Sequence, residues 1–335
     1  MRLANTEKDA SHLNKMASKS KAGKSAIQQQ QEQLVDIPRF EPDRMKKHKI
    51  ILIIGPQYSG KSWLLKDLLY YVNPSFPVLV NPNEFATGFY GGILPKQCKK
   101  ERLDNDWLEK FCGRQRQLLD FNRQNRRNLD CGAGLILDHF TGDLTRTLKW
   151  HLNPYFKFLF QSGKDACTTL VVTSPYPLKL PPDYLASVDY VFMLRETNKK
   201  NKKELFTMFG GMFGTYDNFE DIFDQCTINY RALVIDRTKR SSEITDQVFW
   251  YKAPKRPRRF RMGSPRLWSV CYNTSVSLED LLTKPLMLYE GPSSRSDSRE
   301  RYSRTSTNPY SRSRPQYPYQ PQRPHRNQYD RGNGY

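Results

Sequence analysis

The chain has 335 residues, which is enough for one large domain with appendages or for two small domains. Its formal net charge of +20 favours a polyanionic partner, nucleic acid first, although basic charge also solubilises unfolded ends. The six cysteines lack the spacing of a zinc site, no stretch reaches the roughly 18 apolar residues of a membrane span, and the first residues do not read as a secretory leader. We therefore expect a soluble intracellular protein that does not associate with a membrane.

The N-terminal arm, residues 1–45, is rich in lysine and glutamine and has few apolar residues before Leu34 and Ile37. Such a segment cannot bury enough apolar surface to offset the entropy of folding, so we expect it to be disordered. The apolar pattern begins at residues 50–54, Ile-Ile-Leu-Ile-Ile, which is typical of a strand buried on both faces of a parallel sheet. Residues 62–71 follow with leucines at the spacing of a helix core face.

Further strands are predicted along the chain, and the first four lie at residues 76–80, 133–137, 168–173 and 188–194. The segments between them are long enough for crossover helices. Two amphipathic helices and then two strands at one sheet edge are predicted at residues 202–209, 219–226, 230–236 and 247–252. The expected fold class is α/β, with a mostly parallel sheet flanked by helices in a domain that spans residues 46–253.

Residues 254–290 are predicted to form a basic linker and C-terminal extension, and residues 291–335 a disordered tail rich in Arg, Ser, Tyr and Pro. From Arg295 to Arg331 the tail has nine arginines and three acids, which suits contact with the phosphates and bases of nucleic acid. A solvated tail or a protein-docking arm is an equally good interpretation. The basic cluster from Lys255 to Arg259 indicates either a nuclear import signal, and with it a location in the nucleus, or a basic hinge to DNA.

The most specific motif follows the first strand, where residues 55–62 fit the pattern G-x-x-x-x-G-K-[ST]. In this pattern backbone N–H groups wrap the phosphates of a nucleotide, and the glycines keep side chains out of their way. Lys61 would reach the β- and γ-phosphates, Ser62 would bind Mg²⁺, and the next helix would place its N-terminus against the anion. The alternative is a coincidental glycine turn. The predicted ATP-binding residues are Gly55, Pro56, Gln57, Tyr58, Ser59, Gly60, Lys61 and Ser62.

Asp138 follows the strand predicted at residues 133–137 and is the second candidate ligand of Mg²⁺. A motor with a phosphate loop needs a carboxylate at the end of a neighbouring strand to anchor the metal. The plainer alternative is that Asp138 caps the helix that follows.

Several short blocks occur in an order that carries a resemblance; they are residues 83–85, 89–90, 94–95, 188–196, 211–213, 224–227 and 248–253. Together with the phosphate loop and Asp138, they make residues 49–253 resemble the packaging ATPases of large eukaryotic DNA viruses, a branch of the FtsK/HerA superfamily of P-loop NTPases. The resemblance implies a RecA-like sheet and a homo-oligomeric ring around double-stranded DNA, with ATP bound between subunits. It also implies docking on capsid or portal vertex proteins and association with the virion.

Three positions differ from the family pattern. His139 stands where the family usually has the acid that activates water, a role that suits Asp or Glu. Lys164 replaces an arginine expected to act on a neighbouring subunit's nucleotide, and lysine cannot make the same bidentate contact with phosphate. Pro175 stands where a glutamine that senses the γ-phosphate is expected.

Other residues are candidates for the missing roles. Glu84 and Asp143 could orient the attacking water, although the preferred interpretation of each is an ordinary surface acid. Thr173 or Ser174 could replace the polar contact of the glutamine.

The predicted function is an ATPase that drives double-stranded DNA into a viral capsid, with Lys61, Asp138, Glu84 and Lys164 as catalytic residues and ATP and Mg²⁺ as cofactors. The main alternative is a DNA-docking protein that binds ATP without hydrolysing it, which the divergent residues favour. A helicase is the third interpretation, and it ranks last because motifs for strand separation are not evident.

Overall fold

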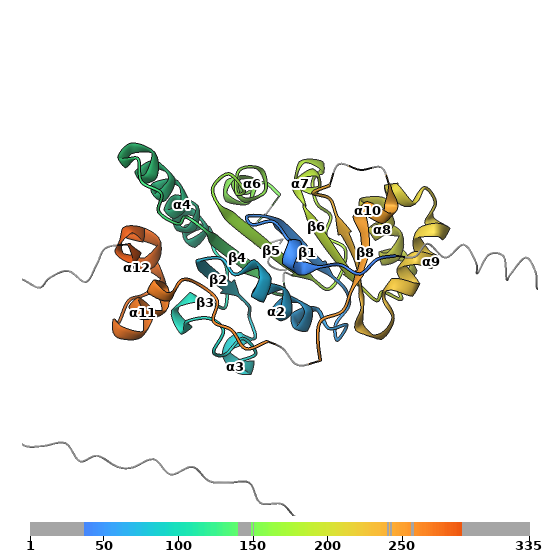
Figure 1. The fold of residues 1–335 in the computed structure, drawn as a ribbon, viewed down its shortest axis with the longest axis horizontal. Helices are drawn as coiled ribbons and strands as arrows, with labels where there is room; N and C mark the ends of the chain where they lie inside the picture. Colours follow the sequence, from blue (N-terminus) through green and yellow to red (C-terminus); the bar gives the residue numbers. More distant parts are fainter. Residues whose placement is uncertain are drawn as a thin grey trace, which may run out of the picture. The chain divides into compact units, whose positions relative to one another are not determined.

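The structure is a computed structural model that describes residues 37–139, 149, 151–239, 241, 243–255 and 258–289. An eight-stranded sheet forms its centre, with the strand order β3-β2-β4-β5-β1-β6-β7-β8 (Figure 1). The strands are β1 (Ile50–Ile54), β2 (Phe76–Val80), β3 (Lys99–Lys100), β4 (Ala133–Leu137), β5 (Thr168–Ser174), β6 (Tyr190–Leu194), β7 (Ala232–Asp236) and β8 (Val248–Tyr251).

The first six strands run parallel, and β7 and β8 add an antiparallel edge. Every residue of β1 is buried, as the continuous apolar run predicted. The predicted mostly parallel α/β sheet is therefore confirmed, and each predicted strand is present with ends shifted by two residues at most. The sequence did not indicate β3, whose two lysines are too short a run to show a period.

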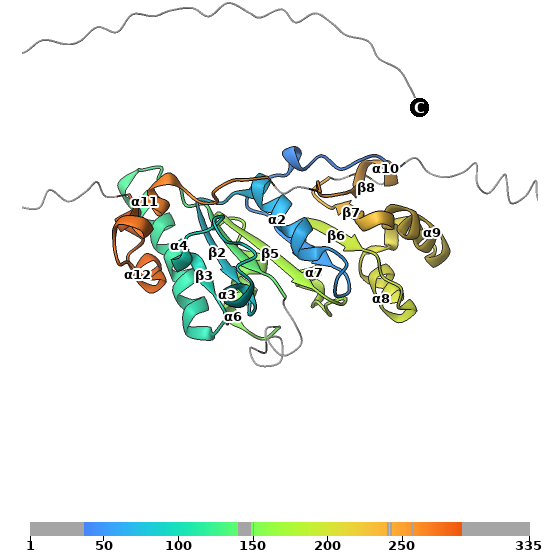
Figure 2. The same cartoon turned by 90° about the horizontal axis from the view of Figure 1, so that it is seen from below.

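Helices cover both faces of the sheet: α2 lies on one side, and α6 and α7 lie on the other (Figures 1 and 2). Side-chain caps define several of their ends, since Asp104 accepts from the backbone N–H of Trp107 and Asn198 from that of Lys200. The helices are α2 (Lys61–Val72), α3 (Glu84–Thr87), α4 (Asn105–Asn125), α6 (Pro154–Gln161), α7 (Pro182–Ser187), α8 (Lys199–Phe209), α9 (Tyr216–Cys226), α10 (Ile244–Gln247), α11 (Pro265–Asn273) and α12 (Leu278–Thr283). None of the helices in the described part of the chain has the length and apolar content to span a bilayer.

Residues 37–45 pack on the domain, so the prediction that the whole arm 1–45 is disordered is wrong for this part. The backbone N–H of Phe40 donates to the carbonyl of Trp250 at 2.8 Å, and the N–H of Trp250 donates to the carbonyl of Pro38 at 3.0 Å. Phe40 is 4% exposed and makes edge contacts with four aromatic rings, those of Tyr190, Phe192, Phe249 and Tyr251. The buried ring and the two backbone hydrogen bonds together hold the segment against β8. Residues 1–36 lie outside the described residues.

The segment after β8 also contributes to the fold. Ser264 caps α11, and Ser277 and Asp280 form a reciprocal capping box at α12. Leu267, Leu281 and Leu282 are buried. The predicted linker and extension therefore contains ordered helices, whereas the predicted Arg-rich tail from 291 lies outside the described residues.

Replacing Phe40 with alanine should destabilise the domain by about 3 to 5 kcal/mol, because a buried aromatic ring is removed from a packed cluster. Phe85→Ala is the matched control, since Phe85 is 50% exposed and its removal should change stability by less than about 0.5 kcal/mol. Thermal unfolding midpoints measure both. Equal midpoints for the two variants would show that residues 37–40 do not hold the sheet edge.

Candidate functional site

The phosphate loop joins the end of β1 to the start of α2. A side chain at Gly55 would place its Cβ 2.8 Å from both Leu194 Cβ and Ser59 Oγ, so only glycine fits there. Gly60 has a φ of 96°, in the region that favours glycine. Because α2 begins at Lys61, the unpaired N–H groups of its first turn lie beside the loop. Such a helix start is suited to binding an anion.

Two buried polar groups of the loop fit a polyphosphate. The Lys61 side chain is buried, and its Nζ donates to the carbonyl of Pro56 at 2.8 Å. Burial lowers the pKa of Lys61, and the charge of nearby Asp138 partly offsets this. Ser59 Oγ is buried and has no hydrogen-bond partner in the described part of the chain. A bound phosphate would give Ser59 a partner and Lys61 an anionic one.

Asp138 lies at the carboxyl end of β4 and is 1% exposed. Its Oδ1 accepts from Thr173 Oγ1 at 2.7 Å and from Ser62 Oγ at 3.4 Å. Its Oδ2 accepts from Tyr90 Oη at 2.8 Å and from Asn81 Nδ2 at 3.0 Å. Four segments distant in sequence therefore aim their polar groups at one carboxylate.

The pair Ser62 and Asp138 fits Mg²⁺ bound together with nucleotide phosphates. The pair offers a hydroxyl and a carboxylate, and Mg²⁺ prefers such oxygen ligands while keeping several waters. Within the described ranges no group of three or more His, Cys, Asp or Glu could hold a metal by itself, so phosphates would have to complete the shell. Burial and then the charge of Asp138 raise the pKa of Tyr90 well above its usual value, which keeps its hydroxyl a donor to the carboxylate.

Glu84 lies near this centre but is already paired. Its carboxylate is 2.6 Å from Lys99 Nζ and accepts the backbone N–H of Tyr90 at 3.0 and 3.1 Å. It is 2% exposed. The structure therefore places Glu84 where it holds the loop that carries Tyr90, and its predicted role in orienting water stays a prediction.

Lys164 lies at the amino ends of the parallel strands, at the opposite end from the phosphate loop. Its Nζ pairs with Asp189 at 2.8 Å, and Asp189 accepts the backbone N–H of Ile50 at the start of β1. The phosphate loop follows the other end of β1, which is roughly 16 Å away for a strand of five residues. Lys164 thus does not reach the nucleotide site of its own chain, and its predicted action on a neighbouring subunit stays a prediction.

Thr173 and Ser174, the candidates to replace the missing glutamine, are the last two residues of β5. The Thr173 hydroxyl donates to Asp138 and accepts the backbone N–H of His139 at 2.9 Å, so it lies beside the candidate metal ligand, and its predicted contact with the γ-phosphate stays a prediction. Ser174 instead donates to the carbonyl of Tyr176 within its own turn. Asp143 lies outside the described residues.

Two cavities that the sequence did not predict flank the phosphate loop. One, of about 490 Å³, lies between loop residues 56–59 and residues 227–230. The other, of about 310 Å³, is lined by Gly60, Trp63 and Lys252, among others. Tyr230 borders both cavities and is 71% exposed. Asn229 and Tyr230 have φ values of 53° and 61°, a strained conformation of the kind that gathers at binding sites.

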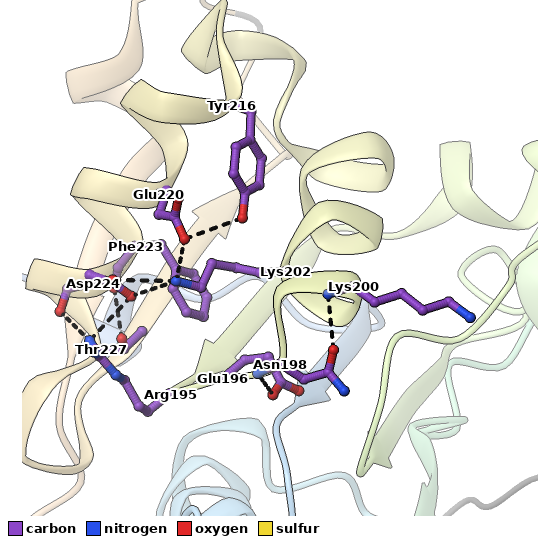
Figure 3. A network of polar contacts seen from close by, with 10 residues as sticks. All are labelled: Arg195, Glu196, Asn198, Lys200, Lys202, Tyr216, Glu220, Phe223, Asp224 and Thr227. Carbon is purple, nitrogen blue, oxygen red and sulfur yellow. Dashed lines mark hydrogen bonds and ion pairs between the residues drawn. The ribbon is translucent and has the colours of Figure 1, made fainter.

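A charged network holds the residues beside the first cavity (Figure 3). Arg195 follows β6 and lines the cavity, and its Nη1 donates to the carbonyl of Asp224 at 2.8 Å. The buried Lys202 pairs with Glu220 at 2.7 Å and with Asp224 at 3.2 Å. The network ties the end of β6 to α8 and α9, and so positions residues 227–230.

Thr173→Val should weaken Mg²⁺-dependent nucleotide binding by about 10- to 100-fold, because partners that orient a metal-binding carboxylate contribute about that much to affinity. Thr173→Ser keeps the hydroxyl and should retain affinity near the wild-type value. Titration of nucleotide binding against Mg²⁺ measures both variants. If valine and serine have the same effect, the hydroxyl does not orient Asp138.

Relatives of the chain are found among viral proteins, although no family model matches it. It is 29% identical over 233 residues to the uncharacterized protein L437 of Acanthamoeba polyphaga mimivirus, covering 68% of this chain and 80% of L437. It is 32% identical over 206 residues to the uncharacterized protein 088R of Invertebrate iridescent virus 3, covering 61% of this chain and 75% of 088R.

A solved structure similar to the chain is the genome packaging NTPase B204 from Sulfolobus turreted icosahedral virus 2 in complex with AMP. The TM-score is 0.44 at 15% identity, covering 63% of this chain and 100% of that one. The predicted resemblance to proteins of large DNA viruses is confirmed by L437 and 088R. The chain belongs to the family of large DNA virus proteins that includes 088R.

Proposed function

We propose that the chain is an ATP-driven motor that moves double-stranded DNA into a viral capsid. The observation that carries this proposal is the meeting of the phosphate loop, Lys61 and the pair Ser62 and Asp138 at the carboxyl edge of a parallel sheet. This is the arrangement in which P-loop NTPases hold a nucleoside triphosphate and its metal. The ordered motif blocks and the viral family direct the proposal to genome packaging.

Each residue of the centre has a role in this function. Mg²⁺, when bound, would supply positive charge that offsets the charge of the phosphates. Ser62 and Asp138 would hold the ion, and the hydroxyls of Tyr90 and Thr173 already fix the carboxylate in place without it. Lys61 exchanges its contact with the Pro56 carbonyl for phosphate oxygens. Groups fixed in advance in a buried site stabilise developing charge more effectively than mobile groups do.

The base of the nucleotide is assigned to the cavity lined by Trp63 and Tyr230. This cavity adjoins Gly60, so a nucleotide whose phosphates lie in the loop can reach it. Trp63 Nε1 donates to the carbonyl of Pro254, which fixes the ring as one wall. The exposed ring of Tyr230 is then free to stack on a base, a contact worth about 1 to 3 kcal/mol.

A second candidate function is an ATP-binding clamp that docks on DNA without turnover. Its support is that the carboxylate of Glu84 is engaged with Lys99 and Tyr90, while His139 stands at the position of the usual acid. A carboxylate held in this way is poorly placed to accept a proton from water. The two functions differ in one measurable property, which is the turnover of ATP.

The wild-type chain should hydrolyse ATP faster when double-stranded DNA is present. Lys61→Ala should lower this rate by at least about 100-fold, because it removes the positive charge that faces the transferred phosphate. Lys157→Ala, an exposed lysine on α6, is the matched control and should retain the wild-type rate. Tight binding of ATP without turnover would instead support the clamp, and absence of ATP binding would contradict both functions.

Tyr230→Ala should raise the dissociation constant for ATP about tenfold through the loss of stacking, and leave the affinity for inorganic tripolyphosphate unchanged. Tyr230→Phe keeps the ring and should bind ATP like the wild type. Competition against a fluorescent nucleotide measures these affinities. Equal losses for ATP and tripolyphosphate would place Tyr230 at the phosphates and not at the base.

A further inference from the structure

A third cavity, of about 930 Å³, lies away from the phosphate loop. One wall is formed by Lys66 of α2 and by Gly91, Gly92 and Ile93 of the loop after α3. The other wall is formed by residues 258–261, which follow the sheet. We call this cavity the basic groove.

The basic groove has four cations, Lys66, Arg258, Arg259 and Arg261. Among the described residues that line it, none is acidic. All three arginines are exposed. Glu84 and Asp67 lie outside the lining but close enough to interact with Lys66 and Arg258. The described lining itself has four cations and no acid, which gives the groove a positive potential that favours an anion.

The arginine wall is held in place by contacts that leave charge facing solvent. The Arg258 guanidinium lies 4.7 Å from the ring centroid of Tyr70 and 5.2 Å from that of Tyr71, and it donates to Tyr71 Oη at 2.9 Å. The backbone N–H of Met262 donates to the carbonyl of Ile93 at 2.8 Å, which joins the two walls. Arginines fixed by stacking lose less freedom on binding phosphate than mobile ones do.

The glycine wall allows a ligand to come close to the backbone. A side chain at Gly92 would meet open space, and its φ of 75° favours glycine. Lys66 Nζ donates to the carbonyl of Phe89 at 2.7 Å, which uses one of its three donors. The same ammonium lies 4.6 Å from the ring centroid of Phe89, and among the described residues no second hydrogen-bond acceptor is found for it.

We propose that the basic groove binds the phosphodiester backbone of double-stranded DNA. The proposal deepens the proposed motor function, on which it rests. A motor that moves along DNA of any sequence needs contacts that do not depend on the bases. Contacts with phosphates meet this need, because they position a protein on DNA without reading its bases. Of the two interpretations of the basic cluster at residues 255–259, this favours the hinge to DNA for Arg258 and Arg259.

The groove also has a physical connection to the ATP site. The loop that forms its glycine wall carries Tyr90, whose hydroxyl donates to Asp138 at 2.8 Å. Glu84 anchors the same loop through the Tyr90 backbone. Lys66 lies on α2, the helix whose first residues are Lys61 and Ser62. DNA that moves the wall formed by Lys66 and residues 91–93 would therefore act on groups one or two contacts from Asp138.

The test compares two variants that lose the same charge. Arg259→Gln with Arg261→Gln removes two cations from the groove. Arg123→Gln with Arg127→Gln removes two exposed arginines, one in the last turn of α4 and one just after it, and serves as the control. Binding of a fluorescent 30-base-pair duplex by the full chain is measured without nucleotide at several salt concentrations. Both variants keep the Arg-rich tail, so its contribution to binding is the same in each.

The groove variant should bind duplex about tenfold more weakly than the wild type, and the slope of log affinity against log salt should fall by about two. The control should stay within about twofold of the wild type. Equal affinities for the two variants would overturn the groove as a DNA site. Because no nucleotide is present, this outcome is independent of ATP turnover, and failure of the motor function would appear only in the hydrolysis assay.

Discussion

One buried carboxylate, that of Asp138, connects the parts of this structure that carry its chemistry. Asp138 is only 1% exposed, and burying a charged carboxylate is costly unless hydrogen bonds compensate for the loss of water. Here Ser62, Asn81, Tyr90 and Thr173 donate to it from four separate segments. The end of the sheet, the phosphate loop helix and the loop after α3 are thereby held in one arrangement, and a metal bound at Asp138 would be sensed by all of them.

Much of the sheet and the phosphate loop could be predicted from the sequence. Strands buried on both faces are continuous apolar runs, as at residues 50–54, and the phosphate loop has a fixed local spacing. The partners of Asp138 could not be predicted, because Asn81, Tyr90 and Thr173 have no common spacing and meet only after the strands have paired. The sequence did not predict that residues 37–40 are ordered, for a similar reason. Phe40 is held by contacts with β6 and β8, which lie far along the chain.

The residues predicted to complete the catalytic set have other partners in a single chain. Glu84 is paired with Lys99. Lys164 is paired with Asp189 at the opposite end of the strands from the phosphate loop. The acid of each pair also accepts a backbone N–H: Glu84 accepts that of Tyr90, and Asp189 accepts that of Ile50. The half of the site that we propose to bind phosphate is therefore complete within one chain, whereas the groups that would activate water or act from a neighbour are not assembled by it. A ring of subunits would supply the groups that act from a neighbour. A clamp that does not hydrolyse ATP would not require them.

The central claim is that Mg²⁺ and a nucleoside triphosphate bind together between the phosphate loop and Asp138. Isothermal titration calorimetry of the full chain with ATP, first with Mg²⁺ and then with the metal removed by a chelator, tests this most directly. We expect one nucleotide per chain and a clear loss of affinity without Mg²⁺, because Ser62 and Asp138 then have no ion to share with the phosphates. Absence of binding in both conditions, or equal affinity in both, would contradict the site.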